Sequence, residues 1–205
     1  MSNVRDYSEF QGKKILFLGA HTLMNHLVNK AREMGVYTIV TDYVKDAPAK
    51  KLADEAYDIS TLDVDALIEL AREKKVDGVF TGYVDINLAP CRKVCEALNL
   101  PFYATLEQID ATMNKVNYKA NCRKYGIRVV DDVPEEFLDG IYDKVNYPVI
   151  VKPADSYSSK GISVCHCKEE MAEALQKAED VSTCKQVVAE QYLEAEDVYL
   201  YFTIQ

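Results

Sequence analysis

The sequence predicts an α/β protein in which a doubly wound parallel sheet is followed by a smaller α+β unit. Up to about residue 111, short apolar runs alternate with amphipathic helical segments through short connections, a pattern that favours right-handed crossovers and a parallel sheet. After Met113, strands are joined by loops and helices at irregular spacing, which indicates an α+β arrangement.

Each element of the first half has a local signal. Residues 14–18 form an apolar run that ends at Gly19, and a helical pattern then continues from residue 22 to Met34. Ser60 followed three residues later by Asp63 predicts a helix start, with Asp in place of the usual Glu of a capping box. The other predicted elements are strands at 36–41, 56–59, 76–81 and 102–103, and helices ending at Lys75 and Leu98, the second capped by Asp85.

The second half begins with a predicted helix at 114–125, which Gly126 closes. The elements predicted after it are strands at 127–130, 147–152, 161–166 and 186–191, and a helix at 168–178. The segment 197–205 alternates and has strand character, so the chain as given is expected to stop in the middle of a strand and to be cut short.

The composition is that of an ordinary globular protein and excludes several classes. The 205 residues are 48% hydrophobic and 28% charged, with a net charge of −9. An acidic chain lacks the basic surface of a general nucleic-acid binder, so no nucleic-acid partner is expected. No uncharged run is long enough to span a membrane, and six scattered cysteines do not make a disulfide framework. A cytoplasmic protein with no membrane partner is therefore expected.

The turn after the first strand occupies the place of a dinucleotide-binding loop. Gly19 is the one glycine there of the three that such a loop needs, and Asp42 stands where an acid would hold a ribose. We favour the simpler interpretation, in which Gly19 makes a turn and Asp42 ends a strand. No phosphate-binding P-loop sequence is present in the chain.

Lys152 follows three apolar residues at the end of a predicted buried strand, and a loop rich in hydroxyl groups comes directly after it. A lysine in such a place is costly unless an anion meets it. Backbone N–H groups and serine hydroxyls of the loop could bind phosphate oxygens above that charge. From these residues alone, an edge-strand lysine beside a solvated loop is an equally good interpretation.

Four segments follow one another in a recognisable order. They are Asn114 and Lys115 followed by Lys119, the strand at 147–153, the loop at 156–162 and the strand at 188–193. Together they resemble the Asp-Lys helix start, phosphate strand, flexible loop and hinge strand of the ATP-grasp enzymes, in the branch that includes biotin carboxylase, carbamoyl phosphate synthetase and the purine carboxylases. Two departures stand out: Asn114 replaces Asp, and no glycine lies between Asp155 and Lys160.

The resemblance implies a division of the chain. Residues 1–112 would form the α/β domain that precedes the ATP-grasp fold, and residues 113–126 a linking helix. Residues 127–190 would form the ATP-grasp lid subdomain, and 191–205 the hinge and first strand of an incomplete C-terminal lobe. The fold would thus be truncated before the second lobe.

The resemblance also implies a nucleotide site. Lys115 and Lys152 would reach the phosphates under the loop, Glu190 would accept from the adenine amino group, and Asp197 would hold the ribose, with Glu196 as the alternative. The expected binding residues are Lys115, Lys152, Ser158, Ser159, Gly161, Glu190, Gln191, Leu193 and Asp197. The family's magnesium ligands would lie beyond residue 205, so no metal or catalytic residue is assigned.

The function implied for the intact protein is that of an ATP-dependent ligase. It would use ATP and Mg²⁺ to activate a carboxylate or bicarbonate as an acyl phosphate, which an amine attacks. Its partners would be ATP and small carboxylate and amine substrates, with a homodimer as a possibility, and this chain by itself is expected to be inactive. The alternatives are a non-catalytic α/β module that binds a small ligand or dinucleotide, and half of a split ligase.

Overall fold

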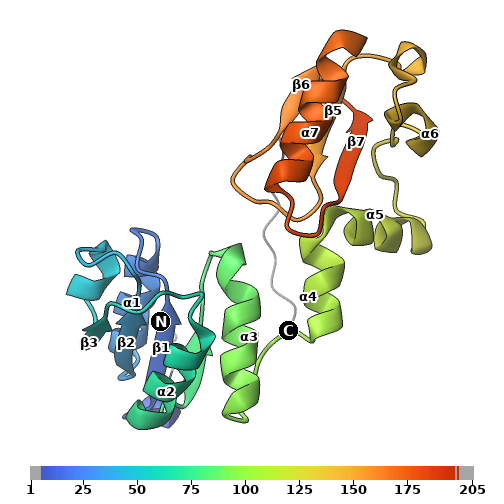
Figure 1. Cartoon of the computed structure of the whole chain (residues 1–205). Helices are drawn as coiled ribbons and strands as arrows, with labels where there is room; N and C mark the ends of the chain where they lie inside the picture. Colours follow the sequence, from blue (N-terminus) through green and yellow to red (C-terminus); the bar gives the residue numbers. More distant parts are fainter. Residues whose placement is uncertain (1–5, 197, 199–205) are drawn as a thin grey trace. The chain divides into compact units, whose positions relative to one another are not determined.

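The structure is a computed structural model that describes residues 6–196 and 198. The chain divides into two compact units, Met1–Asp110 and Ala111–Gln205, each with its own sheet (Figure 1). The first sheet is parallel and the second antiparallel, which confirms the predicted fold class. None of the described helices is long and apolar enough to cross a membrane.

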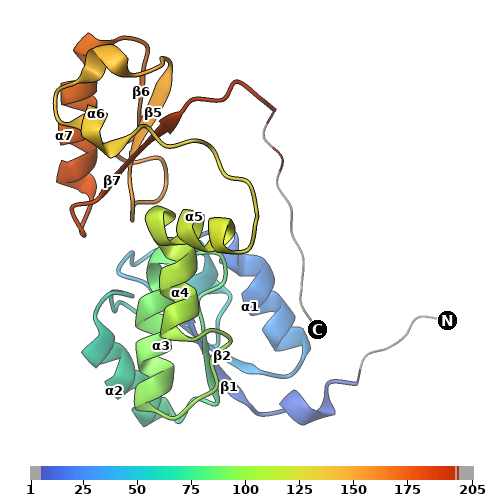
Figure 2. The ribbon, with the colours of Figure 1, turned by 90° about the vertical axis from the view of Figure 1, so that its right-hand side faces the viewer.

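The first unit has four parallel strands in the order β3-β2-β1-β4. The strands are β1 (Lys14–Leu18), β2 (Tyr37–Thr41), β3 (Glu55–Tyr57) and β4 (Gly78–Phe80), and the helices are α1 (Met24–Glu33), α2 (Val64–Lys74) and α3 (Leu88–Ala97). Figure 2 shows α1 on one side of this sheet and α2 and α3 on the other. The sheet is therefore doubly wound, as the alternation of strands and helices predicts.

Both faces of the first sheet are buried because alternate residues of a strand point to opposite sides. Leu16 and Leu18 of β1 pack in a core with residues of α2 and α3. Phe17, between them in sequence, packs in a separate core that includes Met24 and Val28 of α1. The single apolar run of β1 thus supplies side chains to the cores on both faces of the sheet.

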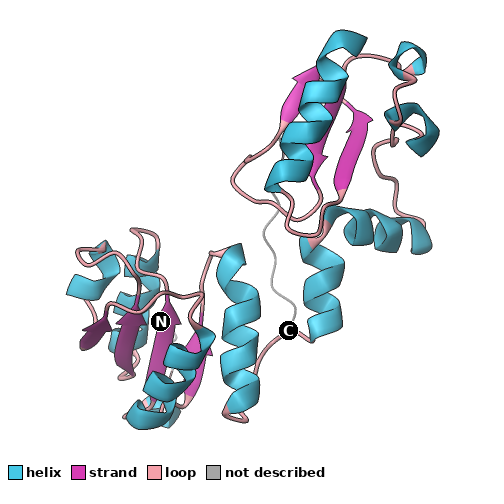
Figure 3. Cartoon of the chain, viewed as in Figure 1, coloured by secondary structure: helices cyan, strands magenta, loops and turns pink. Residues whose placement is uncertain are grey.

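The second unit has three antiparallel strands in the order β6-β5-β7 (Figure 3). The strands are β5 (Val149–Pro153), β6 (Ser163–Cys165) and β7 (Val187–Gln191), and the helices are α5 (Lys115–Lys124), α6 (Glu135–Leu138) and α7 (Met171–Val181). Val149, Val151 and Ala189 share a core with α7. The alternate residues, among them Lys152 and Glu190, therefore lie on the other face.

Two predicted strands are wrong. Residues 102–103 have irregular backbone, and Phe102 is apolar because it packs against the first core and stacks on Tyr103, with ring centroids 4.5 Å apart. Residues 127–130 are also irregular, and next to them only Asp132 bridges to Glu190. At 102–103 the apolar pattern thus reflects side-chain packing, whereas at 127–130 Ile127 is 58% exposed and no described strand pairs there.

A helix that the prediction omitted, α4 (Leu106–Met113), runs through the division between the two units. Its start is a capping box: the N–H of Gln108 donates to Thr105 Oγ1 at 3.1 Å, and the N–H of Thr105 donates to Gln108 Oε1 at 2.8 Å. This signal is readable in the sequence. The short 3₁₀ turns among the described residues are Ser8–Phe10, Pro48–Lys51, Asp85–Asn87, Tyr142–Lys144 and Lys168–Glu170.

The start of α2 also differs from the prediction. Asp63, and not Ser60, is the N-cap: its Oδ1 accepts the N–H of Ala66 at 3.2 Å. Asp85 begins a 3₁₀ turn before α3, whose N-cap is Asn87.

Replacing Asp63 with alanine should therefore destabilise the chain by about 1 kcal/mol, because an N–H at the start of α2 loses its acceptor. Urea unfolding followed by far-UV circular dichroism measures this loss. Glu69→Ala, at an exposed position in the middle of the same helix, is the control and should change the midpoint little. Equal stability of the Asp63 variant and the wild type would show that the cap does not contribute.

Candidate functional site

Lys115 begins α5 and ties that helix to the loop after β5. Asn114 caps the helix, since its Oδ1 accepts the N–H groups of Val116 at 2.9 Å and Asn117 at 3.2 Å. The backbone N–H of Lys115 donates to the carbonyl of Ala154 at 2.8 Å, and its Nζ donates to the carbonyl of Ser156 at 2.8 Å. The Asn at position 114 therefore fills a capping role and leaves the Lys115 ammonium at the loop.

The loop at 156–161 makes a tight turn with little glycine. Ser158 and Ser159 both have φ of 56°, and Gly161 has φ of 74°. Two consecutive non-glycine residues in the left-handed region are uncommon. At Gly161 a Cβ would lie 2.7 Å from Pro153 Cγ, so this position requires glycine. Both serines are exposed at the tip of the loop.

Asp155 anchors the base of this loop to the turn before β7. Its carboxylate accepts from Ser182 Oγ at 2.8 Å, from the N–H groups of Thr183 at 3.1 Å and Cys184 at 3.0 Å, and from the hydroxyl of Thr183. Burial alone would raise the pKa of this carboxyl, but these hydrogen bonds outweigh burial and lower the pKa to about 2. The first residue of the loop region, Asp155, is therefore held in place by the turn before β7.

Lys152 and Glu190 meet on the face of the second sheet that α7 does not cover. Glu190 is 6% exposed, and its Oε1 accepts from Lys152 Nζ. Its other oxygen, Oε2, accepts from Lys119 Nζ at 2.7 Å. A buried carboxylate with two ammonium partners leaves local positive charge in excess.

Lys115 belongs to the same electrostatic environment. Burial lowers the pKa of the Lys115 ammonium, and the nearby charge of Lys152 lowers it further, against the carboxylates of Asp155 and Glu190. Because these two partly buried ammonium groups repel each other, an anion bound between them would be stabilised. The structure thus brings together Lys115, Lys152 and Glu190 from three elements.

The hinge residues are placed differently. The N–H of Gln191 donates to the carbonyl of Asp131 at 3.0 Å, and its side chain Nε2 donates to the carbonyl of Pro148 at 2.7 Å. The backbone N–H of Gln191, one of the expected binding residues, is therefore already used within the protein. Leu193 is 59% exposed, and Asp197 lies outside the described residues.

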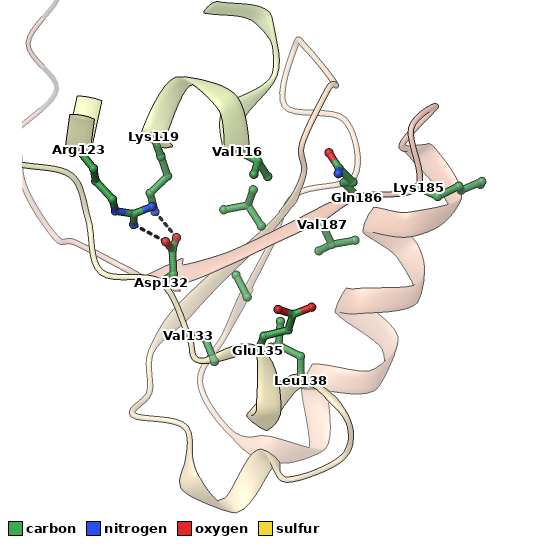
Figure 4. A pocket seen from close by; sticks show the side chains of 12 residues that line it. Val116, Lys119, Arg123, Asp132, Val133, Glu135, Leu138, Lys185, Gln186 and Val187 are labelled. Carbon is green, nitrogen blue, oxygen red and sulfur yellow. Dashed lines mark hydrogen bonds and ion pairs between the residues drawn. The ribbon is translucent and has the colours of Figure 1, made fainter. Parts of the chain in front are cut away.

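A cavity of about 460 Å³ lies between α5, the edge of β7 and the segment at 131–138 (Figure 4). Figure 4 shows Lys119 and Arg123 of α5 both reaching the carboxylate of Asp132. Burial would raise the pKa of the Asp132 carboxyl, but hydrogen bonds from Lys119 and Arg123 hold it below the usual range. Lys119 belongs to the predicted helix-start motif without an assigned role, and Arg123 and Asp132 are not among the predicted site residues. The four-residue spacing that places Lys119 and Arg123 on one helix face is the only local feature of the sequence that could have indicated this cluster.

In the first unit the carboxylate of Asp42 is used by the fold. Asp42 Oδ2 accepts the N–H of Ala20 at 2.9 Å, and its Oδ1 accepts the N–H of Val44 at 2.9 Å. The Asp42 carboxylate thus ends β2 and shapes the turn, as the simpler interpretation predicts. Among the described residues, no group of three or more His, Cys, Asp or Glu side chains could hold a metal ion.

Asp155→Asn should lower the stability of the chain most near neutral pH. Because the folded pKa of about 2 lies below the ordinary value of 3.8, Asp155 contributes stability above about pH 4 that is lost as pH falls through about 2. We expect a difference of about 2 kcal/mol at pH 7 that shrinks towards zero at about pH 2.

Urea unfolding of the wild type and the variant at a series of pH values measures this difference. Asp180→Asn, which alters an exposed carboxylate that accepts from Gln176, is the control and should show a small effect at every pH. A stability difference for Asp155→Asn that stayed constant with pH would contradict the assignment.

Comparison with known proteins gives related sequences. Residues 110–201 match the family model described as D-ala D-ala ligase C-terminus. Formate-dependent phosphoribosylglycinamide formyltransferase of Methanocaldococcus jannaschii is 28% identical over 172 residues, which cover 82% of this chain and 44% of that protein. The enzyme of the same name from Francisella tularensis subsp. tularensis is 29% identical, with coverage of 82% and 45%.

Solved structures share the fold. The biotin carboxylase domain dimer of 2-oxoglutarate carboxylase from Hydrogenobacter thermophilus, in complex with MgADP, ADP and bicarbonate, has a TM-score of 0.75 at 22% identity, covering 90% of this chain and 45% of that one. N5-carboxyaminoimidazole synthetase from Staphylococcus aureus, complexed with ADP, has a TM-score of 0.72 at 24% identity, covering 91% and 49%. The chain spans less than half the length of the curated relatives it matches. In sequence and in fold the chain is therefore similar to ATP-grasp enzymes, as the four sequence segments indicate.

Proposed function

We propose that this chain is the nucleotide-binding portion of an ATP-dependent ligase. The intact protein would transfer the γ-phosphate of ATP to a carboxylate or bicarbonate, and an amine would attack the acyl phosphate. The observation that supports this most is the meeting of Lys115, Lys152 and Glu190 beneath a loop of hydroxyl groups.

The chemistry of phosphoryl transfer suits such a site. Catalysis of this class depends on positioning the phosphates and neutralising their charge, and a pair of lysines from separate elements can do both. The hydrogen bond from Lys115 Nζ to the Ser156 carbonyl couples the first lysine to the loop that would cover the phosphates. Ser158, Ser159 and Gly161 would then supply hydroxyl and N–H donors from the loop.

The adenine end of the nucleotide would lie along the end of β7. When a phosphate draws Lys152 away, Glu190 Oε1 becomes free to accept a hydrogen bond from the adenine amino group. Leu193, exposed in the structure, would provide apolar contact, and Asp197 would hold the ribose hydroxyls. Gln191 would support the strand end through its bond to Asp131.

By resemblance to the ATP-grasp enzymes, magnesium would be held by residues that lie beyond residue 205 of this chain. When bound, Mg²⁺ would neutralise the charge of the phosphate oxygens during transfer of the γ-phosphate. We propose that this chain by itself binds nucleotide without turnover.

The relatives also suggest substrates, a location and an oligomeric state for the intact protein. We propose small carboxylate and amine substrates, a cytoplasmic location and a possible homodimer. All six cysteines are unpaired in the structure, as suits a reducing compartment. A split ligase, in which another chain supplies the remaining lobe, remains the alternative for assembly. A dinucleotide-binding module is disfavoured because Asp42 is occupied by backbone N–H groups.

Lys152→Ala should weaken binding of MgADP to the chain by about tenfold or more, since a charge-assisted contact to phosphate is lost. Lys115→Ala should act in the same direction. Isothermal titration calorimetry measures both.

Lys168→Ala is the matched control for these lysines. Lys168 pairs with Asp143 on the surface, so its removal should leave the affinity unchanged. An affinity for MgADP that survives both Lys115→Ala and Lys152→Ala would contradict the proposed function and favour a ligand site in the first unit.

A further inference from the structure

The two ammonium groups that bind Glu190 differ in how firmly they are held. Lys119 contacts Glu190 Oε2 at 2.7 Å, pairs also with Asp132, and has a side chain that is 9% exposed. Lys152 binds the other oxygen, has a side chain that is 20% exposed, and pairs with no second carboxylate among the described residues. Lys119 is thus a fixed partner, and Lys152 is the one that can leave.

Asp132 is what fixes Lys119. The backbone of Asp132 bridges to that of Glu190 at the edge of β7, so the two carboxylates are held side by side. Arg123, one turn further along α5 than Lys119, also pairs with Asp132. Lys119 therefore lies between two carboxylates whose positions the sheet edge sets.

We propose that Lys119 is a positioning residue that keeps Glu190 neutralised when Lys152 moves from Glu190 to an anionic phosphate. This inference rests on the proposed function, because it gives Lys152 a phosphate to move to. Lys119 itself need not touch the nucleotide. It acts through Glu190, by making Lys152 available.

The physical reason is the cost of an unpaired buried charge. A carboxylate as buried as Glu190 is strongly penalised when it has no cation partner. With Lys119 present, departure of Lys152 still leaves one ion pair. Without Lys119, Lys152 would be the sole cation on Glu190, and an incoming phosphate would have to break that last pair.

The first test measures how available Lys152 is in the chain without nucleotide. Reductive methylation with formaldehyde and cyanoborohydride, followed by peptide mass spectrometry, gives the rate of modification at Lys152. We expect Lys119→Met to slow that rate by about threefold to tenfold, since Glu190 then holds Lys152 more tightly. Adding Glu190→Gln to Lys119→Met should restore the rate, because a neutral amide does not retain the ammonium.

The matched control is Lys124→Met, which removes an exposed lysine from the same helix and should leave the rate at Lys152 unchanged. Lys119→Arg keeps a cation at the position and should react like the wild type. If Lys119→Met does not fold, Glu190→Gln alone must speed modification of Lys152. The proposal is overturned if Lys119→Met, or failing that Glu190→Gln, leaves the rate unchanged.

The second test separates this inference from the proposed function. For MgADP, Lys119→Met should weaken binding about tenfold, and Lys119→Met with Glu190→Gln should recover most of it, since the Gln carbonyl can still accept from an amino group. Loss of affinity without recovery would indicate a merely structural role and overturn the proposal. A wild-type chain that fails to bind MgADP would contradict the proposed function, while the methylation rates would still decide the role of Lys119.

Discussion

The second unit depends on the neutralisation of one buried carboxylate, that of Glu190. This side chain lies on the sheet face that α7 does not cover, and cations reach it from β5 and from α5. Because a buried carboxylate is stable only with partners, Glu190 fixes where Lys152 and Lys119 lie. Through Lys119 it also holds α5 against the edge of β7. The same charge thus organises the fold of this unit and its candidate site.

The loop after β5 is positioned by a second set of contacts that meets the first at Lys115. Asp155 fixes one end of the loop to the turn before β7, and Lys115 holds its backbone from the start of α5. Since Asn114 both caps α5 and donates to Gln186 Oε1 at 3.2 Å, that helix start is joined to the residue just before β7 as well. The loop can therefore change at its exposed tip while its base stays fixed, which is what a cover over phosphates requires.

The sequence predicted the strands that are clear apolar runs and the residues whose chemistry is unusual for their place. Lys152 was recognisable because a cation at the end of an apolar strand needs a partner. Its partners were not, since Lys119 and Glu190 are separated by 71 residues and meet only through the fold. The strand predicted at 127–130 failed because an apolar pattern does not say whether a neighbouring edge is free to pair. The capping box at Thr105 was visible in the sequence and was missed.

An acidic chain can hold an anion site because local arrangement, and not net charge, decides the field at short range. The chain has a net charge of −9, yet Lys115, Lys119 and Lys152 all lie near one buried carboxylate. The exposed carboxylates are screened by water, whereas the partly buried ammonium groups are not. This excess of positive charge is also the reason that we propose a role for Lys119: without Lys119, Glu190 and Lys152 would neutralise each other, and the lysine that we propose binds a phosphate would stay bound within the protein.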